Sequence, residues 1–220
     1  MLRQAMTSDA FPPDGERIPT WREPAQARGR ARVAALLNAA RDLAAETGSL
    51  DFNMSEVAER AGAPIGSLYQ FFPNRTALLA RLFEREMAPI DNALRARLAA
   101  AASTRDVVEG IGDLLRKSLA LVKARPFLFA IWSSPTMDPA LQAADLKNSM
   151  ENAELIAARV RELSDGAANP TDAWETALVV CHLWGSVVRL SALMADAQPG
   201  SGVLEQYVAM VEARFRAILG

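Results

Sequence analysis

The stretch AGAPIGSLYQFFPNR at residues 61–75 concentrates side chains that can make directional contacts with another molecule. Ser67 and Tyr69 carry hydroxyl groups, Gln70 carries an amide, and Arg75 carries a permanent positive charge. Hydroxyl and guanidinium groups donate hydrogen bonds to phosphate oxygens, and a glutamine amide can bond an adenine edge at two atoms. This chemistry suits nucleic-acid recognition, and it requires an element that holds these side chains outward.

Groups suited to catalysis or metal binding are scarce in the chain. It holds one histidine, His182, and one cysteine, Cys181, whose adjacent positions point apart on a helix. This pair does not make a usual metal site, and a single cysteine excludes an internal disulfide. The sequence has no nucleophile elbow, phosphate-cradling loop or glycine-rich dinucleotide fingerprint, although its carboxylates remain available for acid–base chemistry. We therefore predict no enzyme, no metal site and no cofactor.

Composition and charge favour a helical protein with a hydrophobic core. Half of the 220 residues are hydrophobic, and Ala, Leu, Arg and Glu are abundant, which is typical of helices. The net charge is −2, but residues 27–85 hold eight arginines against six acidic residues, an excess of +2. Residues 86–220 hold 13 basic against 16 acidic residues, or −3. This asymmetry indicates a slightly basic N-terminal module.

The sequence offers no clear targeting segment. Its N-terminus lacks an apolar core of signal-peptide length. The longest uncharged apolar run in the C-terminal half, residues 176–188, is shorter than the roughly 20 residues that cross a bilayer. We therefore expect a cytoplasmic protein without membrane association.

Short helices must position the residues of the opening stretch. Residues 1–26 contain four prolines and little periodicity, which predicts a flexible arm. A helix follows at 27–47, with an apolar stripe on one side and Gly48 as its stop. Asn53 then begins a capping box at the start of a helix over 54–61.

A second short helix is expected to start at Pro64, where a missing N–H costs nothing, and to end before Pro73. Leu68 and Phe72 lie four residues apart, so both face the core and fasten this helix. A longer helix follows, with Asn74 as its N-cap. Two short helices joined by a tight turn form a helix-turn-helix, in which the outer face of the second helix enters the DNA major groove.

The order and spacing of these segments resemble one known family. The segments AARDLAAETG, MSEVAERAG, GSLYQFF, PNR and ALL, within residues 33–80, are similar to the N-terminal domain of TetR/AcrR-family transcriptional regulators. The resemblance implies an all-α fold with a three-helix helix-turn-helix DNA-binding domain at 27–75. It also implies a helical effector-binding and dimerisation domain at 76–220, which begins with a linker helix at 76–88.

The resemblance and the side-chain chemistry together predict a set of DNA contacts. Tyr69 matches the family's tyrosine, which is expected to pack on the DNA backbone, and Arg75 matches a basic residue that meets a phosphate. Gln70 is expected to read an adenine edge, and Gly66 to permit close approach. Ser55 and Ser67 are expected to donate to phosphates, Ile65 to contact a thymine methyl group, and the arm arginines to enter the minor groove. The full predicted set is Arg28, Arg30, Ser55, Pro64, Ile65, Gly66, Ser67, Tyr69, Gln70, Phe71 and Arg75.

Two positions depart from the family's pattern. The family usually has a polar residue where Pro64 stands, and often His or Tyr where Phe71 stands, so both changes remove a donor. We expect Phe71 to pack against sugar or thymine methyl groups instead. Phosphate binding is then expected to depend more heavily on Tyr69, Arg75 and the arm.

The long C-terminal segment 171–195 is apolar on nearly all sides, so a helix there must be buried on two faces. The resemblance implies that it forms a four-helix bundle with the last helix and a second copy; a monomer that buries both faces is the alternative. The predicted interface residues are Trp184, Val188, Tyr207, Val211 and Phe215. Pro89 is expected to kink or end the linker helix, and the other helices are predicted at about 91–101, 104–124, 126–133, 139–163 and 203–219.

Aromatic and methionine side chains in the C-terminal half indicate an adaptable apolar cavity for an effector. They cluster in ARPFLFAIWSSPTM, residues 124–137, and on the helices that follow. Plain core packing is the alternative for each of them. The expected effector is small and apolar or aromatic, and the predicted ligand-binding residues are Phe127, Trp132, Met137, Met150, Trp174 and His182.

Two functional hypotheses from different classes follow. The first is a ligand-responsive transcriptional regulator, expected to be a repressor that binds a palindromic DNA operator as a homodimer and leaves it when the effector binds. The second is an all-α small-molecule-binding or protein-interaction module without sequence-specific DNA binding. A helical hydrolase or lyase has no motif in its support.

Overall fold

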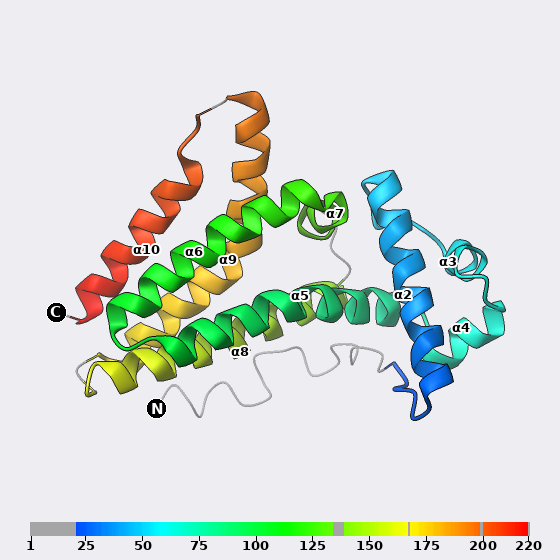
Figure 1. Ribbon diagram of the computed structural model, residues 1–220, viewed down its shortest axis with the longest axis horizontal. Helices are drawn as coiled ribbons and strands as arrows, with labels where there is room; N and C mark the ends of the chain where they lie inside the picture. The colour runs from blue at the N-terminus through cyan, green and yellow to red at the C-terminus, as the bar shows by residue number, and fades with distance from the viewer. Residues whose placement is uncertain (1–20, 134–138, 167, 199, 220) are drawn as a thin grey trace.

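The computed structural model of the chain describes residues 21–133, 139–166, 168–198 and 200–219. Every regular element in these ranges is an α-helix, which confirms the predicted fold class (Figure 1). The helices form a small N-terminal unit and a larger C-terminal unit. In chain order they are α2 (Ala27–Thr47), α3 (Met54–Arg60), α4 (Ile65–Phe71), α5 (Arg75–Ala100), α6 (Thr104–Ala124), α7 (Pro126–Ser133), α8 (Pro139–Leu163), α9 (Pro170–Ala197) and α10 (Val203–Leu219).

Helices α2, α3 and α4 pack together as the N-terminal unit. α2 buries a stripe that includes Val33 and Leu36, and it ends at Gly48, whose φ of 65° lies in the left-handed region that glycine adopts without steric cost. α3 begins with the predicted capping box. Asn53 Oδ1 accepts from Glu56 N at 3.0 Å, and Glu56 Oε2 accepts from Asn53 N at 2.8 Å. These caps fix the turn between the two helices.

The start of α4 differs slightly from the prediction. Pro64 is the N-cap and Ile65 is the first helical residue, because Pro64 has an extended ψ of 136°. The predicted start at Pro64 is therefore wrong by one residue. The start of α5 agrees with the prediction, since Asn74 Oδ1 accepts from Ala77 N at 2.9 Å.

Helix α5 runs unbroken through Pro89. Of the two expectations for Pro89, an end of the linker helix near residue 88 is wrong, and a kink stays a prediction. Met87 and Leu94, on either side of the proline, are buried in the core, whereas Pro89 is exposed. Packing on both sides of the proline therefore outweighs the one backbone hydrogen bond that it removes. As a result, one continuous helix joins the two units (Figure 1).

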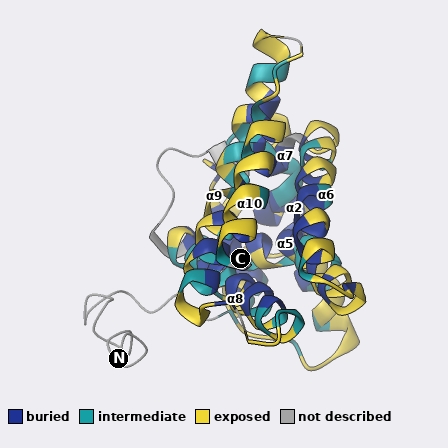
Figure 2. Cartoon of the chain, turned by 90° about the vertical axis from the view of Figure 1, so that its left-hand side faces the viewer, coloured by how far each residue is buried: buried dark blue, intermediate teal, exposed yellow. Residues whose placement is uncertain are grey.

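Five long helices enclose the core of the C-terminal unit. α9 packs against α8, α6 and α10, and α5 lies along α6 and α8. Fully buried side chains include Ile111 and Leu115 of α6, Ile156 of α8 and Phe215 of α10. Figure 2 shows these buried faces turned toward one another and the exposed faces turned outward. Burying one such side chain stabilises the fold by roughly 1.5–3 kcal/mol, so this core holds the helices that frame the cavity described below.

Two further contacts couple the units. Helix α7 packs against α2. Arg85 of α5 donates to Asn38 Oδ1 at 3.1 Å and to the Leu37 carbonyl at 3.3 Å, both on α2. The same guanidinium pairs with the buried Glu86 carboxylate at 2.7 Å. Both α5 and α7 of the C-terminal unit are therefore in direct contact with α2.

Candidate functional site

The outer face of α4 is exposed, as the sequence predicts. Leu68 and Phe72 are completely buried, whereas Tyr69 is 50% exposed and Ile65 is 43% exposed. Gln70 is exposed as well. The helix therefore keeps its two anchors inside and presents its other side to solvent. Reading a major groove requires this arrangement.

Gly66 leaves open space on the same face of α4. A Cβ atom at this position would meet nothing within 4 Å, and the backbone is not in the left-handed region. Neither packing nor backbone conformation therefore requires a glycine here. Ser67, next to it, is half-buried, and Pro64 is exposed. The lack of an internal reason for Gly66 favours close approach by another molecule.

Other predicted DNA contacts lie on neighbouring helices. Ser55 is exposed in the first turn of α3. Arg28 and Arg30 are exposed too, but they belong to the first turn of α2, which corrects their predicted place on the arm. Arg30 Nη1 donates to the Ala25 carbonyl at 2.8 Å.

Arg75 is directed into the protein. Its Nη2 donates to the Leu50 carbonyl, and its guanidinium lies 5.7 Å from the centre of the Phe52 ring. Its Nε is buried without a partner among the described residues. Arg75 therefore fastens the start of α5 to the turn before α3, a contact that the sequence did not predict. A phosphate contact by Arg75 stays a prediction that requires the side chain to swing outward.

The segment before α2 is docked on the DNA-binding unit. Trp21 stacks on Phe72 with ring centres 6.1 Å apart, and the Arg81 guanidinium lies 4.5 Å from the centre of the Trp21 ring. The Arg22 backbone N–H donates to the Phe71 carbonyl at 2.8 Å. This segment therefore connects the end of α4 with α5.

The prediction of a flexible arm over residues 1–26 is wrong for residues 21–26, and residues 1–20 lie outside the described residues. A tryptophan beside prolines and arginines was the available signal for an anchored segment. Phe71 is half-buried and packs against the core, so its ring is only partly free for the predicted contact with DNA.

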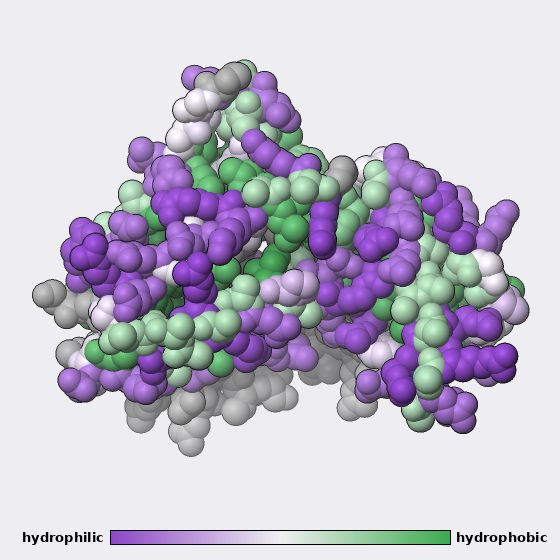
Figure 3. All heavy atoms as spheres, in the orientation of Figure 1, coloured by the Kyte–Doolittle hydropathy of each residue, from purple (hydrophilic) through white to green (hydrophobic). Residues whose placement is uncertain are grey.

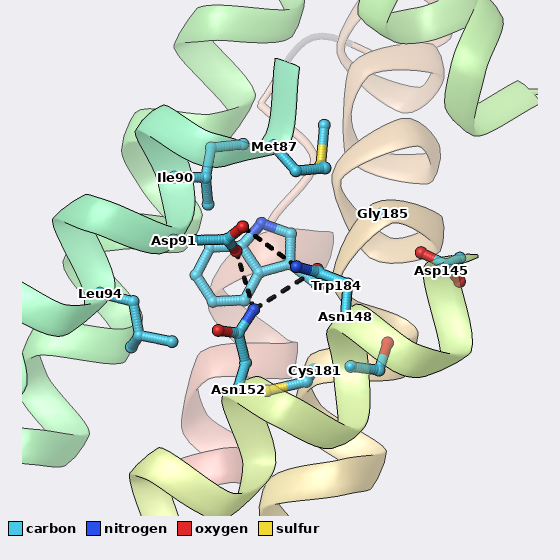
Figure 4. Close-up of a pocket in the computed structure, with 11 residues that line it drawn as sticks. Met87, Ile90, Asp91, Leu94, Asp145, Asn148, Asn152, Cys181, Trp184 and Gly185 are labelled. Atoms are coloured by element: carbon cyan, nitrogen blue, oxygen red, sulfur yellow. Dashed lines mark hydrogen bonds between the residues drawn. The ribbon is translucent and has the colours of Figure 1, made fainter. Parts of the chain in front are cut away.

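A small cavity of about 50 Å³, open to solvent on one side, lies between α5, α8 and α9 (Figure 4). Its apolar wall consists of Met87, Ile90 and Leu94 of α5 together with the Trp184 indole ring of α9. Gly185, next to Trp184 on α9, also lines the cavity.

Asp91 is the centre of the polar wall. Its carboxylate oxygens accept from Asn148 Nδ2 at 3.0 Å and from Asn152 Nδ2 at 2.8 Å. Asn152 Nδ2 also lies 3.4 Å from Asn148 Oδ1. Asn152 Oδ1 is buried and has no partner among the described residues. The wall therefore presents more hydrogen-bond acceptors than donors.

A second carboxylate lies at the edge of the cavity. His182 Nδ1 is 3.5 Å from Asp145 Oδ2 and 3.4 Å from Ser149 Oγ. Burial raises the pKa of the Asp145 carboxyl, and the nearby His182 partly opposes this rise. Burial, aided by the negative charge of Asp91, raises the pKa of the Cys181 thiol to about 12. Cys181 is therefore a protonated, unreactive wall residue at neutral pH.

The predicted ligand-binding residues do not line this cavity. Phe127 belongs to the buried core, and Met150 and Trp174 are half-buried outside the lining. His182 is exposed and reaches the cavity only through Asp145 and Ser149. Two further predicted residues, Trp132 and Met137, lie outside the described side chains.

The predicted residues were selected for their aromatic and methionine content, and Phe127 belongs to the core. A role for the others in effector binding stays a prediction. The polar residues of α8 were a better signal for the position of the cavity. Asn148 and Asn152 are one helical turn apart, and Asp145 and Ser149 form a parallel pair on the same helix. Four polar residues on the inward side of a helix require partners or a cavity.

Three of the five predicted interface residues are core residues of a single chain. Val188 and Phe215 are 0% exposed, and Val211 is 5% exposed. The prediction that they contact a second copy is therefore wrong, because their side chains are already enclosed within one chain.

The two other predicted interface residues also make internal contacts. Trp184 lines the cavity, and its Nε1 donates to Ser118 Oγ at 3.1 Å. The Tyr207 hydroxyl donates to the Val180 carbonyl at 3.0 Å, and burial raises the pKa of this hydroxyl. Both are half-buried, so they hold α9 to its neighbours within one chain.

A different set of apolar residues is exposed on α9. Val179, Leu183, Leu190 and Leu193 are each between 42% and 56% exposed, and their spacing places them on one stripe of the helix. Met210 of α10 is 68% exposed. We call the four α9 residues the α9 face. In the space-filling view, apolar residues gather over parts of the C-terminal unit while the N-terminal unit is more polar (Figure 3).

Family models match both units of the chain. Residues 36–82 match the model of bacterial regulatory proteins of the tetR family. Residues 105–217, about half of the chain, match the model of the tetracyclin repressor-like C-terminal domain. The chain belongs to the TetR family. The predicted family is therefore confirmed.

Solved TetR-like structures share the fold. The fatty acid degradation regulator FadR from Bacillus halodurans is 18% identical with a TM-score of 0.61, over 90% of this chain and 97% of that one. FadR from Bacillus subtilis, solved with stearoyl-CoA, is 16% identical with a TM-score of 0.61, over 85% and 97%. A TetR-family regulator from Streptomyces coelicolor is 21% identical with a TM-score of 0.60, over 85% and 99%. A comparison with curated protein sequences finds no match.

Membership of the TetR family defines the general function. This TetR protein is a DNA-binding transcriptional regulator with a ligand-binding domain, and it is not an enzyme. Repression, ligand binding and homodimers are typical of the family.

Helix α9 is long and apolar enough to cross a membrane by length and composition, and 28% of its most apolar window is buried. One such helix is weak evidence for a membrane span. In this TetR protein α9 packs along α8, α6 and α10, and its apolar character follows from that packing and from the α9 face.

Proposed function

We propose that this TetR protein is a ligand-responsive repressor that binds a palindromic operator as a homodimer in the cytoplasm. The observation that carries the proposal is that α4 has one buried side and one exposed side. Leu68 and Phe72 are fully buried, and Tyr69 and Gln70 stand outward beside the open position of Gly66. A short helix anchored in this way can enter a major groove without disturbing its own core.

Helix α4 supplies the contacts that would read the operator. Tyr69 packs on the sugar–phosphate backbone, Gln70 bonds a base edge, and Gly66 lets the helix approach closely. Ser55 of α3 and the first turn of α2, with Arg28, reach phosphates at either side. The exposed positions of these side chains support this arrangement.

A second copy covers the α9 face. A TetR dimer places two α4 helices on successive turns of one side of the duplex, about 34–36 Å apart. One stripe of α9 carries four large, exposed apolar side chains. Two copies of α9 related by a two-fold axis would bury these side chains against each other. This surface replaces the interface residues that the sequence predicted.

The effector acts through α5. Met87, Ile90, Asp91 and Leu94 of this helix line the cavity, and the same helix begins in the DNA-binding unit. Arg85 on α5 also holds α2. A ligand that binds the cavity better in one α5 position shifts the distance between the two α4 helices, and operator affinity falls.

A footprint on the DNA upstream of the protein's own gene tests this proposal. We expect protection of an inverted repeat, with an affinity that falls steeply as salt rises. The substitution Lys123→Ala, at an exposed position of α6, should leave the footprint unchanged. Equal, sequence-independent binding to every duplex would favour a protein-interaction module instead.

A further inference from the structure

The cavity between α5, α8 and α9 has an acidic and acceptor-rich wall opposite an aromatic one. Two of its eleven lining residues, Asp91 and Asp145, are carboxylates, and none is Lys or Arg. A second hollow adjoins this cavity and shares Asp91 with it. Its described lining contains one basic residue, Lys147, whose Nζ lies 3.8 Å from Glu151 Oε1. Among the described residues that line the two hollows, no cation therefore balances Asp91.

The hydrogen bonds of Asp91 leave it short of donors. Only two neutral amides, Asn148 Nδ2 and Asn152 Nδ2, donate to its carboxylate. A half-buried carboxylate gains more from a positively charged donor than from an amide. Asp91 is thus only partly compensated within the described part of the chain.

Asn152 provides an independent sign of a missing donor. Its side chain is more than nine-tenths buried, and its Oδ1 has no hydrogen-bond partner among the described residues. Figure 4 shows this oxygen turned away from Asp91, toward the side of the cavity where Leu94 lies. The amide cannot be reversed, because Nδ2 donates to Asp91 and lies close to Asn148 Oδ1. A buried acceptor is satisfied only when a donor, from water or from a ligand, reaches it.

We propose that this cavity binds an organic cation, an amine with an apolar or aromatic body. The ammonium group donates to Asp91 and Asn152 Oδ1, and the body lies against Trp184, Met87 and Ile90. The indole ring adds a cation–π attraction. An anionic ligand meets two carboxylates and no basic residue in the lining, so it is rejected. The inference names the effector class of the proposed regulator and therefore rests on the proposed function.

Three probes of matched size test the charge preference. Isothermal titration calorimetry of the full chain would compare 4-phenylbutylamine, 4-phenylbutanol and 4-phenylbutyrate. We expect the amine to bind at least about tenfold more tightly than the alcohol, the effect of one charge-assisted hydrogen bond. The acid should show no binding at millimolar concentration. Equal affinity for the amine and the alcohol, preference for the acid, or no binding by any probe would overturn the proposal.

Two isosteric variants test the location. Asp91→Asn should weaken amine binding about tenfold or more and leave alcohol binding within twofold, while Glu175→Gln, an exposed carboxylate on α9, should change neither. If Asp91→Asn does not fold, Asp145→Asn should give a smaller loss in the same direction. Unchanged amine affinity in the folded variants would overturn the assignment to this cavity.

A parallel binding assay with operator DNA separates the two proposals. An amine that binds the cavity without releasing DNA supports the cation site and contradicts the effector mechanism. DNA binding that persists while no amine binds supports the regulator and overturns the cation site.

Discussion

At the scale of single residues, a substitution at Gly66 should change folding stability and operator affinity in opposite directions. Gly66→Ala adds a methyl group in open space on α4, so we expect it to stabilise the fold by roughly 0.5–1 kcal/mol through the lower conformational entropy of the unfolded chain. The same methyl group faces the proposed DNA surface and should weaken operator binding by about tenfold. Thermal melting and fluorescence anisotropy with a labelled operator measure the two effects. A variant that is both destabilised and fully active would contradict this assignment.

Cys181 should resist alkylation in the folded protein. Its pKa of about 12 lies far above neutral pH, so the thiolate is a very small fraction of the population at pH 8. Iodoacetamide labelling followed by mass spectrometry should be slow in the native state and fast in guanidinium chloride. Because the folded pKa is raised, the native rate should increase as pH rises from 8 to 10. Rapid native labelling at pH 7 would show that the wall of α9 opens readily.

At the scale of elements, the segment before α2 couples α4 to α5. Trp21→Ala removes a ring that stacks on Phe72 and lies under Arg81, and we expect a loss of about 2 kcal/mol of folding stability together with weaker operator binding. Trp21→Phe should recover much of both, because it keeps the stacking. Urea unfolding and DNA titration provide the readouts. Wild-type stability in Trp21→Ala would mean that the segment is not docked in solution.

The helices of the DNA-binding unit could be predicted because their signals are local. Asn53 and Asn74 have side chains that cap the next helix, and Leu68 and Phe72 are spaced to fall on one side of it. The course of α5 could not be predicted in the same way. Whether Pro89 ends a helix depends on the packing of Met87 and Leu94, and that packing is set by helices distant in the sequence.

At the scale of the whole molecule, the apolar residues of α9 were recognised but assigned to the wrong sides. The sequence shows that α9 has two apolar faces and does not show which one meets α6, α8 and α10. Val188 turned out to be internal, and Leu183 external. Similarly, the cavity depends on contacts of Asp91 on α5 with Asn148 and Asn152 on α8, which are 57 and 61 residues further along the chain.

The α9 face should control assembly. Leu183→Glu places a charge in the proposed interface, so we expect a dimer-to-monomer shift in light scattering coupled to size exclusion, with loss of operator binding. The control Gln142→Glu adds the same charge at an exposed position of α8 and should remain dimeric. A Leu183→Glu protein that stays dimeric would move the interface to another surface.

The central claim is that the outward side of α4 reads DNA while its inward side only anchors it. The most direct measurement is the affinity of Tyr69→Ala for the footprinted operator and for a scrambled duplex, with melting temperature as the check on folding. The account predicts an unchanged melting temperature, because Tyr69 is half exposed, and a loss of at least about tenfold in operator affinity. Operator binding equal to wild type in a folded Tyr69→Ala protein would contradict it.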